Sequence, residues 1–441
     1  MQQKHLAGQL VEFSIPLILS GLLQQLFNWA DAFIVGNVVG ENALAAVGAT
    51  MYVTALFLAA ITGFTSGVSI LAARMFGEGR MEEQKRVLFT FLCVLGAAFL
   101  LLTGGGMWII EPVLRRMDTP ADIFDMARIY LRIVLTGVPF LAIYNVYAAV
   151  LRGIGDSRAP FWAVMVSVTV NVGLDILLVA VIPMGVAGAA IATVISQVMM
   201  ALFLVVYAGR VHSALALCGG AALFDVSLLK EGSALAAPIT VQFVVRSLGG
   251  LVLQSFMNGF GTQTVAAIST AYRVDSLILL PVDNLGVAVS TLTAQNTGAG
   301  DHRRAKKCLY VGLGLMAVVS VCLTGVVLGL GGTMISLFGV TAESTAIGVR
   351  FFHSIAWFYI INGWSVAFRS YLEGTGDVLF SGVTGILSLG VRIALSYALI
   401  GVFDNMVIAY AEAFAWCFTL LLYAIRFGSR TRNPLARDGA V

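Results

Sequence analysis

The chain has 441 residues, of which 59% are hydrophobic and only 11% are charged. A soluble globular protein carries about 25% charged residues, so this composition excludes an ordinary soluble domain. The net charge of +3 is small, and we attribute it to basic loops that face anionic lipid. We expect no nucleic-acid partner. The five cysteines and four histidines are scattered without a disulfide or metal-site spacing.

Apolar stretches of about 20 residues, long enough to cross a bilayer, recur along the whole chain. We therefore predict an all-α membrane protein with twelve membrane-spanning helices. Their expected ranges are 12–35, 46–72, 87–110, 125–149, 159–182, 185–208, 233–258, 265–294, 308–332, 343–368, 379–400 and 407–426. The first span is followed by no small-residue cleavage site, so we expect no removable signal peptide.

Lysine and arginine are distributed asymmetrically about these spans. If the N-terminus is cytoplasmic, the inner loops carry most of them, including Arg80, Arg152 and Lys306, whereas the outer loops carry little beyond Arg115 and Arg116. Such a bias predicts a multi-pass protein of the cell (inner, cytoplasmic) membrane with both termini in the cytoplasm. The lipid bilayer is then a constant partner of the chain.

The second half of the chain repeats the first at one constant offset, which places position 69 on position 290. "SILAARMFGEGRMEEQKRVL" (69–88) and "STLTAQNTGAGDHRRAKKCL" (290–309) share seven of twenty residues, and "LRGIGD" (151–156) and "LEGTGD" (372–377) share four of six. Asn37, Ala45 and Ala46 fall on Asn258, Ala266 and Ala267 at the same offset. The chain therefore contains an internal duplication.

Each half contains six predicted spans, which makes the halves parallel repeats related by a pseudo-twofold axis along the membrane normal. We predict an N-terminal six-helix lobe with a cation site (1–210), a cytoplasmic linker (211–232), a C-terminal six-helix lobe (233–427) and a cytoplasmic tail (428–441). Two such lobes favour a transporter that works by alternating access. A duplication kept only for stability is the alternative.

Glycines punctuate the repeated motifs, at 77, 79, 153, 155, 298, 300, 374 and 376. We interpret them as structural hinges in short turns that need a positive φ. No strand precedes them and no Lys-Ser/Thr follows, so they do not predict a phosphate-binding loop.

Four motifs, taken in order, identify the family that this sequence resembles. They are "DAFIVGNVVGENALAAVGA" (31–49), "LAARMFGEGR" (71–80), "LRGIGDSRAP" (151–160) and "AQNTGAGDHRRA" (294–305). As a set they resemble the MATE (multidrug and toxic compound extrusion) family, and its bacterial multidrug branches in particular. The loop "RMFGEGRMEEQKR" does not match the corresponding loop of major facilitator transporters.

The resemblance implies a coupling-cation site in the N-terminal lobe. In sodium- or proton-coupled members of the family its ligands are an Asp on span 1, an Asn and an Asp four apart on span 5, and a Thr on span 6. Asp31, Asn171, Asp175 and Thr193 are similar residues at these places. Pro16 resembles the proline about which span 1 bends in some members.

Physical reasoning points to the same residues. Asn171 and Asp175 lie one turn apart on one helical face, and a buried carboxylate in lipid costs roughly 2.5 kcal/mol or more. A rise of about 1.5 Å per residue brings Asp31, Asp175 and Thr193 to the outer half of the membrane. An all-oxygen set suits a hard cation such as Na⁺, and without a metal two close carboxylates would share a proton. A satisfied polar contact between three helices is the alternative.

The C-terminal half lacks this site, because Arg392 replaces Asn171, and Ser396 and Phe414 replace Asp175 and Thr193. Arg392 should pair with an acid, and the candidates are Asp275 and Asp283 on span 8, with Glu412 on span 12. We expect a span 8 partner, and the two aspartates to share one helical face. The set of candidates for a charge network or substrate contacts in this half is Arg246, Arg273, Asp275, Asp283 and Arg392.

The sequence as a whole predicts a cation-coupled (H⁺ or Na⁺) antiporter that exports amphipathic organic cations or drugs. Trp357, Tyr359 and Trp364 are weaker candidates for substrate contacts through cation–π interactions. A flippase for a lipid-linked saccharide is the alternative function. We find no nucleophile–base arrangement and expect no enzyme activity and no cofactor, and we expect a monomer.

Overall fold

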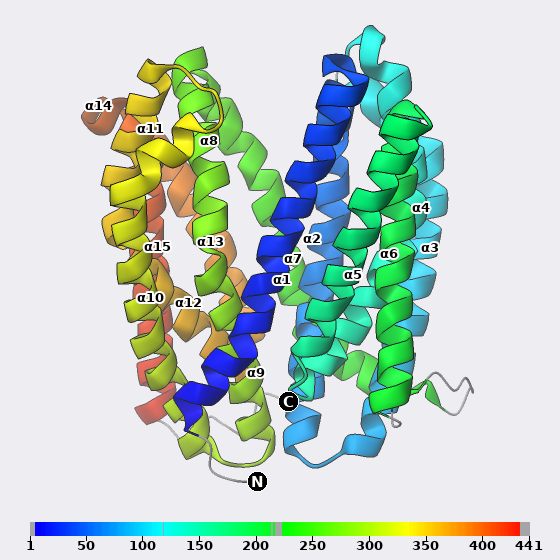
Figure 1. The fold of residues 1–441 in the computed structure, drawn as a ribbon. Coiled ribbons are helices and arrows are strands. Elements are labelled where there is room, and N and C mark those ends of the chain that lie inside the picture. Colours follow the sequence, from blue (N-terminus) through cyan, green and yellow to red (C-terminus); the bar gives the residue numbers. More distant parts are fainter. Residues whose placement is uncertain (1–4, 118, 213–214, 217–222, 433–441) are drawn as a thin grey trace. The chain divides into compact units, whose positions relative to one another are not determined.

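The fold is described from a computed structural model of the chain (Figure 1). The structure describes residues 5–117, 119–212, 215–216 and 223–432, and these are helical apart from short turns. Lipid offers the backbone no hydrogen-bond partners, so apolar spans close their own hydrogen bonds as helices.

The described helices of the first half are α1 (Leu6–Ile34), η1 (Val35–Val39), α2 (Glu41–Gly77), η2 (Met81–Glu83), α3 (Gln84–Arg116), α4 (Ala121–Gly153), α5 (Arg158–Asp175), η3 (Ile176–Val181) and α6 (Gly185–Val211). Those of the second half are α7 (Val226–Asn258), α8 (Thr262–Ile278), α9 (Leu280–Gly298), α10 (His302–Ser336), α11 (Ala342–Ile355), η6 (Ala356–Phe358), α12 (Tyr359–Gly374), α13 (Val378–Ala398), α14 (Ile400–Phe403), η7 (Asp404–Met406) and α15 (Val407–Arg432).

The prediction of twelve membrane spans is confirmed. Within the described ranges, eleven helices are long and apolar enough to cross a membrane, and the pair α8–α9 forms the twelfth span if its two helices are counted together. This pair is bent by 40° at Leu279. Asp275 therefore lies on α8 and Asp283 in the first turn of α9, so the helix between them is broken and not continuous. The two aspartates nevertheless interact electrostatically, in agreement with the prediction that they face the same side.

The described contacts divide the chain into two compact units. The N-unit is Ile15–Thr240, and the C-unit is the chain up to Ser14 together with the chain from Val241. Both divisions fall inside a continuous helix, α1 or α7, and each lies within three residues of a proline, Pro16 or Pro238. The contacts thus divide the chain at places other than the predicted lobe limits, since the first turns of α1 group with the second half and the start of α7 with the first.

Two glycines of α2 explain why the start of α7 groups with the N-unit. A Cβ atom added to Gly67 would lie 2.3 Å from the Cα atom of Ala236, and one added to Gly63 would lie 2.6 Å from the Cα atom of Thr240. Lipid removes most of the hydrophobic drive between membrane helices, so close backbone approach at a GxxxG pair is a main source of their packing energy. Gly63 and Gly67 form such a pair.

The duplication is visible in the positions of the helices. In the N-unit, α4 packs against α2, α3, α5 and α6, and it is the most buried span of that unit. The offset of the duplication places the ends of α4 on Ala342 and Gly374, and the segment between these two residues forms α11, η6 and α12 in the C-unit. The second copy is interrupted at η6, where the first copy is a continuous helix.

The repeated glycine turns also match. The second glycine of each motif has a positive φ: Gly79 (78°), Gly155 (96°), Gly300 (74°) and Gly376 (88°). The first glycine ends a helix instead, and a Cβ on Gly153 would lie 2.6 Å from that of Ala72. One glycine of each motif is thus needed for its conformation, and Gly153 for close packing.

The aspartate that follows each "GxG" in the second motif fastens its turn to the last helix of its half. Asp156 accepts a hydrogen bond from the Tyr207 hydroxyl (3.0 Å) on α6 and lies 3.1 Å from His212 Nε2. Asp377 pairs with Arg426 (2.7 Å) and Arg430 (3.1 Å) on α15. The motif therefore anchors the turn as well as shaping it.

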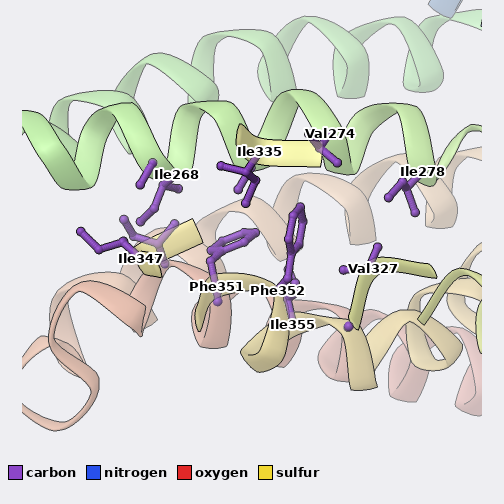
Figure 2. Close-up of a cluster of buried hydrophobic side chains, with 14 of the residues drawn as sticks. Ile268, Val274, Ile278, Val327, Ile335, Ile347, Phe351, Phe352 and Ile355 are labelled. Carbon is purple, nitrogen blue, oxygen red and sulfur yellow. The ribbon is translucent and has the colours of Figure 1, made fainter. Parts of the chain in front are cut away.

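An apolar cluster fills the part of the C-unit built from α8, α10, α11 and α15 (Figure 2). Phe351 and Phe352 project from α11 among Ile268, Val274 and Ile335, and both rings are fully buried. This cluster fixes α11 against α8, and so sets where Asp275 lies relative to the start of α12.

We predict that Gly67→Ala lowers the melting temperature of the detergent-solubilised protein. The added methyl group would overlap the backbone of α7, and overpacking typically costs about 1–3 kcal/mol. Gly48→Ala on the same helix is the matched control, since a Cβ there meets nothing within 4 Å. Equal melting temperatures for the two variants would contradict the close contact of α2 with α7.

Candidate functional site

Three polar side chains predicted to bind a cation are buried in the N-unit. Asn171 and Asp175 lie one turn apart on α5 with no solvent exposure, and Asp31 on α1 is 8% exposed. Neither carboxylate oxygen of Asp175, neither amide atom of Asn171, nor Oδ1 of Asp31 has a hydrogen-bond partner among the described residues. Leaving a buried polar group unpaired costs about 1–3 kcal/mol, and more if the group is charged.

The two carboxylates lie close to each other and to one phenol. Asp31 and Asp175 interact electrostatically, and both interact with the Tyr130 side chain of α4. Tyr130 is buried. The structure thus brings together Asp31 and Asp175, which lie far apart in the sequence. Tyr130 was not predicted, because a tyrosine in an apolar helix gives no signal of what it faces.

A π-helical turn begins within four residues after each aspartate. α1 passes into η1 four residues after Asp31, and Asp175 is the last α-helical residue before η3. Val35 of η1 and Val179 of η3 are buried in the same apolar cluster. π-Helical turns often mark functional sites, because the extra residue redirects side chains and loosens the ladder of backbone hydrogen bonds.

Thr193 lies near this group but is not joined to it by a hydrogen bond. It is buried on α6, which packs along α5. Across the described residues, its hydroxyl group makes no hydrogen bond with Asp31, Asn171 or Asp175. Its place as a ligand therefore stays a prediction.

The donor set of this site fits a hard cation or a proton. Two carboxylates and an amide offer oxygen atoms, which suit Na⁺ better than a soft metal. No group of three or more His, Cys, Asp or Glu side chains that could hold a metal ion occurs in the described ranges. The partnerless oxygens of Asp31, Asn171 and Asp175 are the observation that favours a cation here over a satisfied polar contact.

Pro16 lies inside α1, fifteen residues before Asp31. Its ring removes one backbone N–H from the helix, and its carbonyl oxygen accepts a hydrogen bond from the Ser20 hydroxyl (2.8 Å). The inner half of α1 therefore has a local weakness in its hydrogen-bond ladder.

The C-unit has a cavity of about 460 Å³ among α7, α8, α9, α12, α13 and α15. Its size is within the range of small-molecule sites. Six charged side chains line it, three of each sign: Arg246, Arg369, Arg392, Asp275, Asp283 and Glu412. The break between α8 and α9 lies on its wall, since Leu279 is a lining residue.

Arg392 pairs with an acid in this cavity, but the acid is not on span 8. Its Nη2 lies 3.0 Å from Glu412 Oε2 on α15 and donates a hydrogen bond to the Tyr272 hydroxyl (2.7 Å). Its guanidinium group also lies over the Tyr272 ring, 5.7 Å from the centroid. The expectation of a span 8 partner is wrong, because Asp275 is held by another group.

That other group is the Tyr359 hydroxyl, which donates a hydrogen bond to Asp275 Oδ1. Tyr359 is the first residue of α12, directly after the 3₁₀ turn η6, and it is fully buried. It is therefore a partner of Asp275, which argues against the prediction that its ring contacts substrate. Trp357 and Trp364, the other two aromatic candidates, are 66% and 37% exposed and do not line this cavity.

The remaining charged candidates make no ion pair among the described residues. Arg246 and Asp283 line the cavity, and Asp283 interacts electrostatically with Asp275 and Arg369. Arg273 is exposed on α8 and does not line the cavity. The structure thus supports a network around Arg392 and Asp275, to which sequence reasoning did not assign Tyr272, Tyr359 or Arg369.

A family model described as MatE matches residues 16–177 and 238–398. The two matched segments correspond to each other at the offset of the duplication, to within one position at either end.

The chain belongs to the MATE family.

Relatives of known description include transporters of different cargo. The chain is 29% identical over 398 residues to "Probable multidrug resistance protein YoeA" of Bacillus subtilis (strain 168), covering 88% of this chain and 85% of that protein. It is 27% identical over 320 residues to the "FAD transporter" of Shewanella oneidensis (strain MR-1), covering 70% and 69%. MATE proteins are transporters and not enzymes, so this chain is a multi-pass transport protein of the cell membrane.

A solved structure shows the same fold. It is described as the outward-facing conformation of a multidrug resistance MATE family transporter of the MOP superfamily; the TM-score is 0.90 at 20% identity, with 98% of each chain covered. At that identity the likeness supports the MATE fold alone.

We predict that Gly188→Ala impairs the cation-coupled transport that we propose below more than Gly173→Ala does. A Cβ on Gly188 of α6 would lie 2.9 Å from the carbonyl oxygen of Leu178 in η3, whereas one on Gly173 meets nothing within 4 Å. Displacing η3 should move Asp175, and raise the cation concentration for half-maximal transport. Identical concentration dependence in the two variants would show that η3 does not position Asp175.

We predict that Arg392→Ala and Glu412→Ala each lower the melting temperature, because removing one member of a fully buried ion pair costs about 3–5 kcal/mol and this pair, with side chains 20% and 13% exposed, is largely buried. The double variant should lose less than the sum of the two. Arg273→Ala, an exposed arginine without an ion pair in the described chain, is the control and should change little. Strictly additive losses would rule out the pairing.

Proposed function

We propose that this protein exports amphipathic organic cations in exchange for a proton or Na⁺ taken up at Asp31, Asn171 and Asp175, with Thr193 as a further ligand. Membership of the multidrug transporter family supports efflux, and the partnerless buried oxygens of these residues support the coupling site. That second observation carries the proposal, because a cation or proton would supply the partners that the three side chains lack.

Coupling follows from differential binding. A ligand with equal affinity for two conformations shifts neither, so cation and drug must favour different states of the protein. Filling the site removes repulsion between Asp31 and Asp175 and lets η1 and η3 repack. By linkage, the cation must weaken drug binding by the same factor as the drug weakens cation binding.

The C-unit cavity is where we expect charge selection of the cargo. Its three arginines are matched by three acids, so it lacks the strong positive charge that a pyrophosphate-bearing lipid would need. This balance supports the exporter over a flippase for lipid-linked saccharides. Trp416 lines the cavity beside Tyr359 and offers an aromatic face to an organic cation.

We predict that Asp175→Asn abolishes gradient-driven export in proteoliposomes while the protein still inserts and folds. An amide cannot exchange a proton and binds Na⁺ more weakly than a carboxylate. The measurement is efflux of a fluorescent organic cation under a Na⁺ gradient and, separately, under a pH gradient, which also identifies the coupling ion. Asp122→Asn, at an exposed position in the first turn of α4, is the matched control.

If Asp175→Asn transports at the wild-type rate under both gradients, the site is structural only. If the wild-type protein transports organic cations under neither gradient but moves an anionic lipid, its function is that of a flippase and the proposal of an exporter is wrong.

A further inference from the structure

A second hollow, outside the sites described above, lies at the start of α10 in the C-unit. It has a volume of about 700 Å³ and is lined by the beginning of α1 and the first turns of α10. Arg303, Arg304, Lys306 and Lys307 line it, with one acid, Asp301. Tyr310 lines it too, and its side chain is 59% exposed. The transport mechanism uses none of these residues.

The four basic side chains of this hollow are not neutralised by the described part of the chain. None of them makes an ion pair there, and Arg304 Nη2 donates its hydrogen bond to a neutral acceptor, Gln9 Oε1 on α1 (3.1 Å). Asp301, the nearest acid in sequence, accepts from the Arg304 backbone N–H (2.8 Å) as the cap of α10. The hollow therefore keeps a concentrated positive charge.

The equivalent turn of the N-unit serves as an internal comparison. At the offset of the duplication, Glu82 and Glu83 stand where Arg303 and Arg304 stand, whereas Lys85 and Arg86 match Lys306 and Lys307. Both arginines of that turn are paired: Arg80 contacts Glu78 (3.0 Å) and Glu83, and Arg86 lies 3.8 Å from Asp225. Acids therefore balance much of the positive charge of the N-unit turn, whereas the equivalent turn of the C-unit remains strongly basic.

We propose that the hollow at the start of α10 binds the phosphate of an anionic phospholipid headgroup. Clustered Lys and Arg beside a membrane helix attract anionic lipid, and guanidinium groups bind phosphate oxygens in a bidentate fashion. Tyr310 lies one to two turns further along α10 at the membrane end of the cluster, a place where an aromatic ring with a polar tip meets headgroups favourably. The side concerned is the one to which the positive-inside pattern assigns the cytoplasm.

The bound headgroup has a structural consequence for α1. The first turns of α1, up to Ser14, group with the C-unit, and Gln9 is tied there by Arg304. A phosphate held among Arg303, Arg304 and Lys306 would orient the Arg304 side chain that holds Gln9. Anionic lipid therefore fastens the start of the helix that carries Asp31.

The test is a titration of the full-length protein, purified in neutral detergent, with three additives: dioctanoyl phosphatidylglycerol, dioctanoyl phosphatidylcholine and inorganic phosphate. Apparent affinities come from the rise in melting temperature with ligand concentration. The variant is Lys306→Gln/Lys307→Gln, and its control is Lys85→Gln/Arg86→Gln, which removes two charges at the equivalent positions. In each pair the first residue is half-buried and the second is exposed.

Phosphatidylglycerol should stabilise the wild type and the Lys85→Gln/Arg86→Gln control variant to the same extent. Its apparent affinity should fall about 25-fold in the Lys306/Lys307 variant, at about fivefold for each charge removed. Equal losses in both pairs, or equal stabilisation by phosphatidylcholine, would overturn the proposal. So would full stabilisation by inorganic phosphate, which would make the hollow a site for a soluble anion.

Native mass spectrometry tests the same proposal by direct competition between the two lipids. In an equimolar mixture of the two lipids, the protein should retain phosphatidylglycerol preferentially. Retention in equal amounts would contradict a headgroup site. The exposed single change Arg303→Gln should reduce that preference.

Discussion

The fold depends on one constraint: a backbone in lipid must satisfy its own hydrogen bonds, and every departure from a regular helix has to be compensated locally. In the described spans, the departures from regular α-helix that bear on the two sites lie close to buried acids. In the N-unit the departures are the π-helical turns after Asp31 and Asp175; in the C-unit they are the break after Asp275 and the 3₁₀ turn before Tyr359. Irregular backbone next to a buried carboxylate is typical of transporter binding sites.

The acids of the two units differ in whether they have a partner within the protein, although the two halves are copies of one duplicated segment. In the C-unit, Asp275 and Glu412 have Tyr359 and Arg392 beside them, so their burial is compensated within the protein. In the N-unit, Asn171 and Asp175 have no such partner among the described residues. A compensated network stabilises one arrangement of helices, whereas an uncompensated one responds to a ligand. At the offset of the duplication, Arg392 of the compensated network stands where Asn171 stands in the uncompensated one.

Hydropathy and the repeat were enough to predict the twelve spans and the duplication, because both depend on patterns along the chain. The family resemblance and the spacing of residues along the helices singled out Asp31 and Asp175, but they did not indicate Tyr130 beside them. The partner of Arg392 was not predictable in this way, since Glu412 and Asp275 are both acids within apolar spans and only tertiary packing decides between them. Pro281, at the start of α9, was a usable signal for the break in span 8, whereas the π-helical turns have none in the sequence. The hollow at the start of α10 was visible only as basic residues, which by themselves indicate topology.

The division of the chain inside α1 and α7 bears on how the protein could be dissected. A cut in the connection between α6 and α7 looks like the natural place to separate the halves, since the duplication ends and begins again there. Each fragment would nevertheless lack a segment that packs within its own unit: the first would miss the start of α7 that fits Gly63 and Gly67, and the second the first turns of α1 that meet Arg304. The two gene halves therefore do not encode two independent folding units, and fragments of this kind are expected to be stable only when they are produced together.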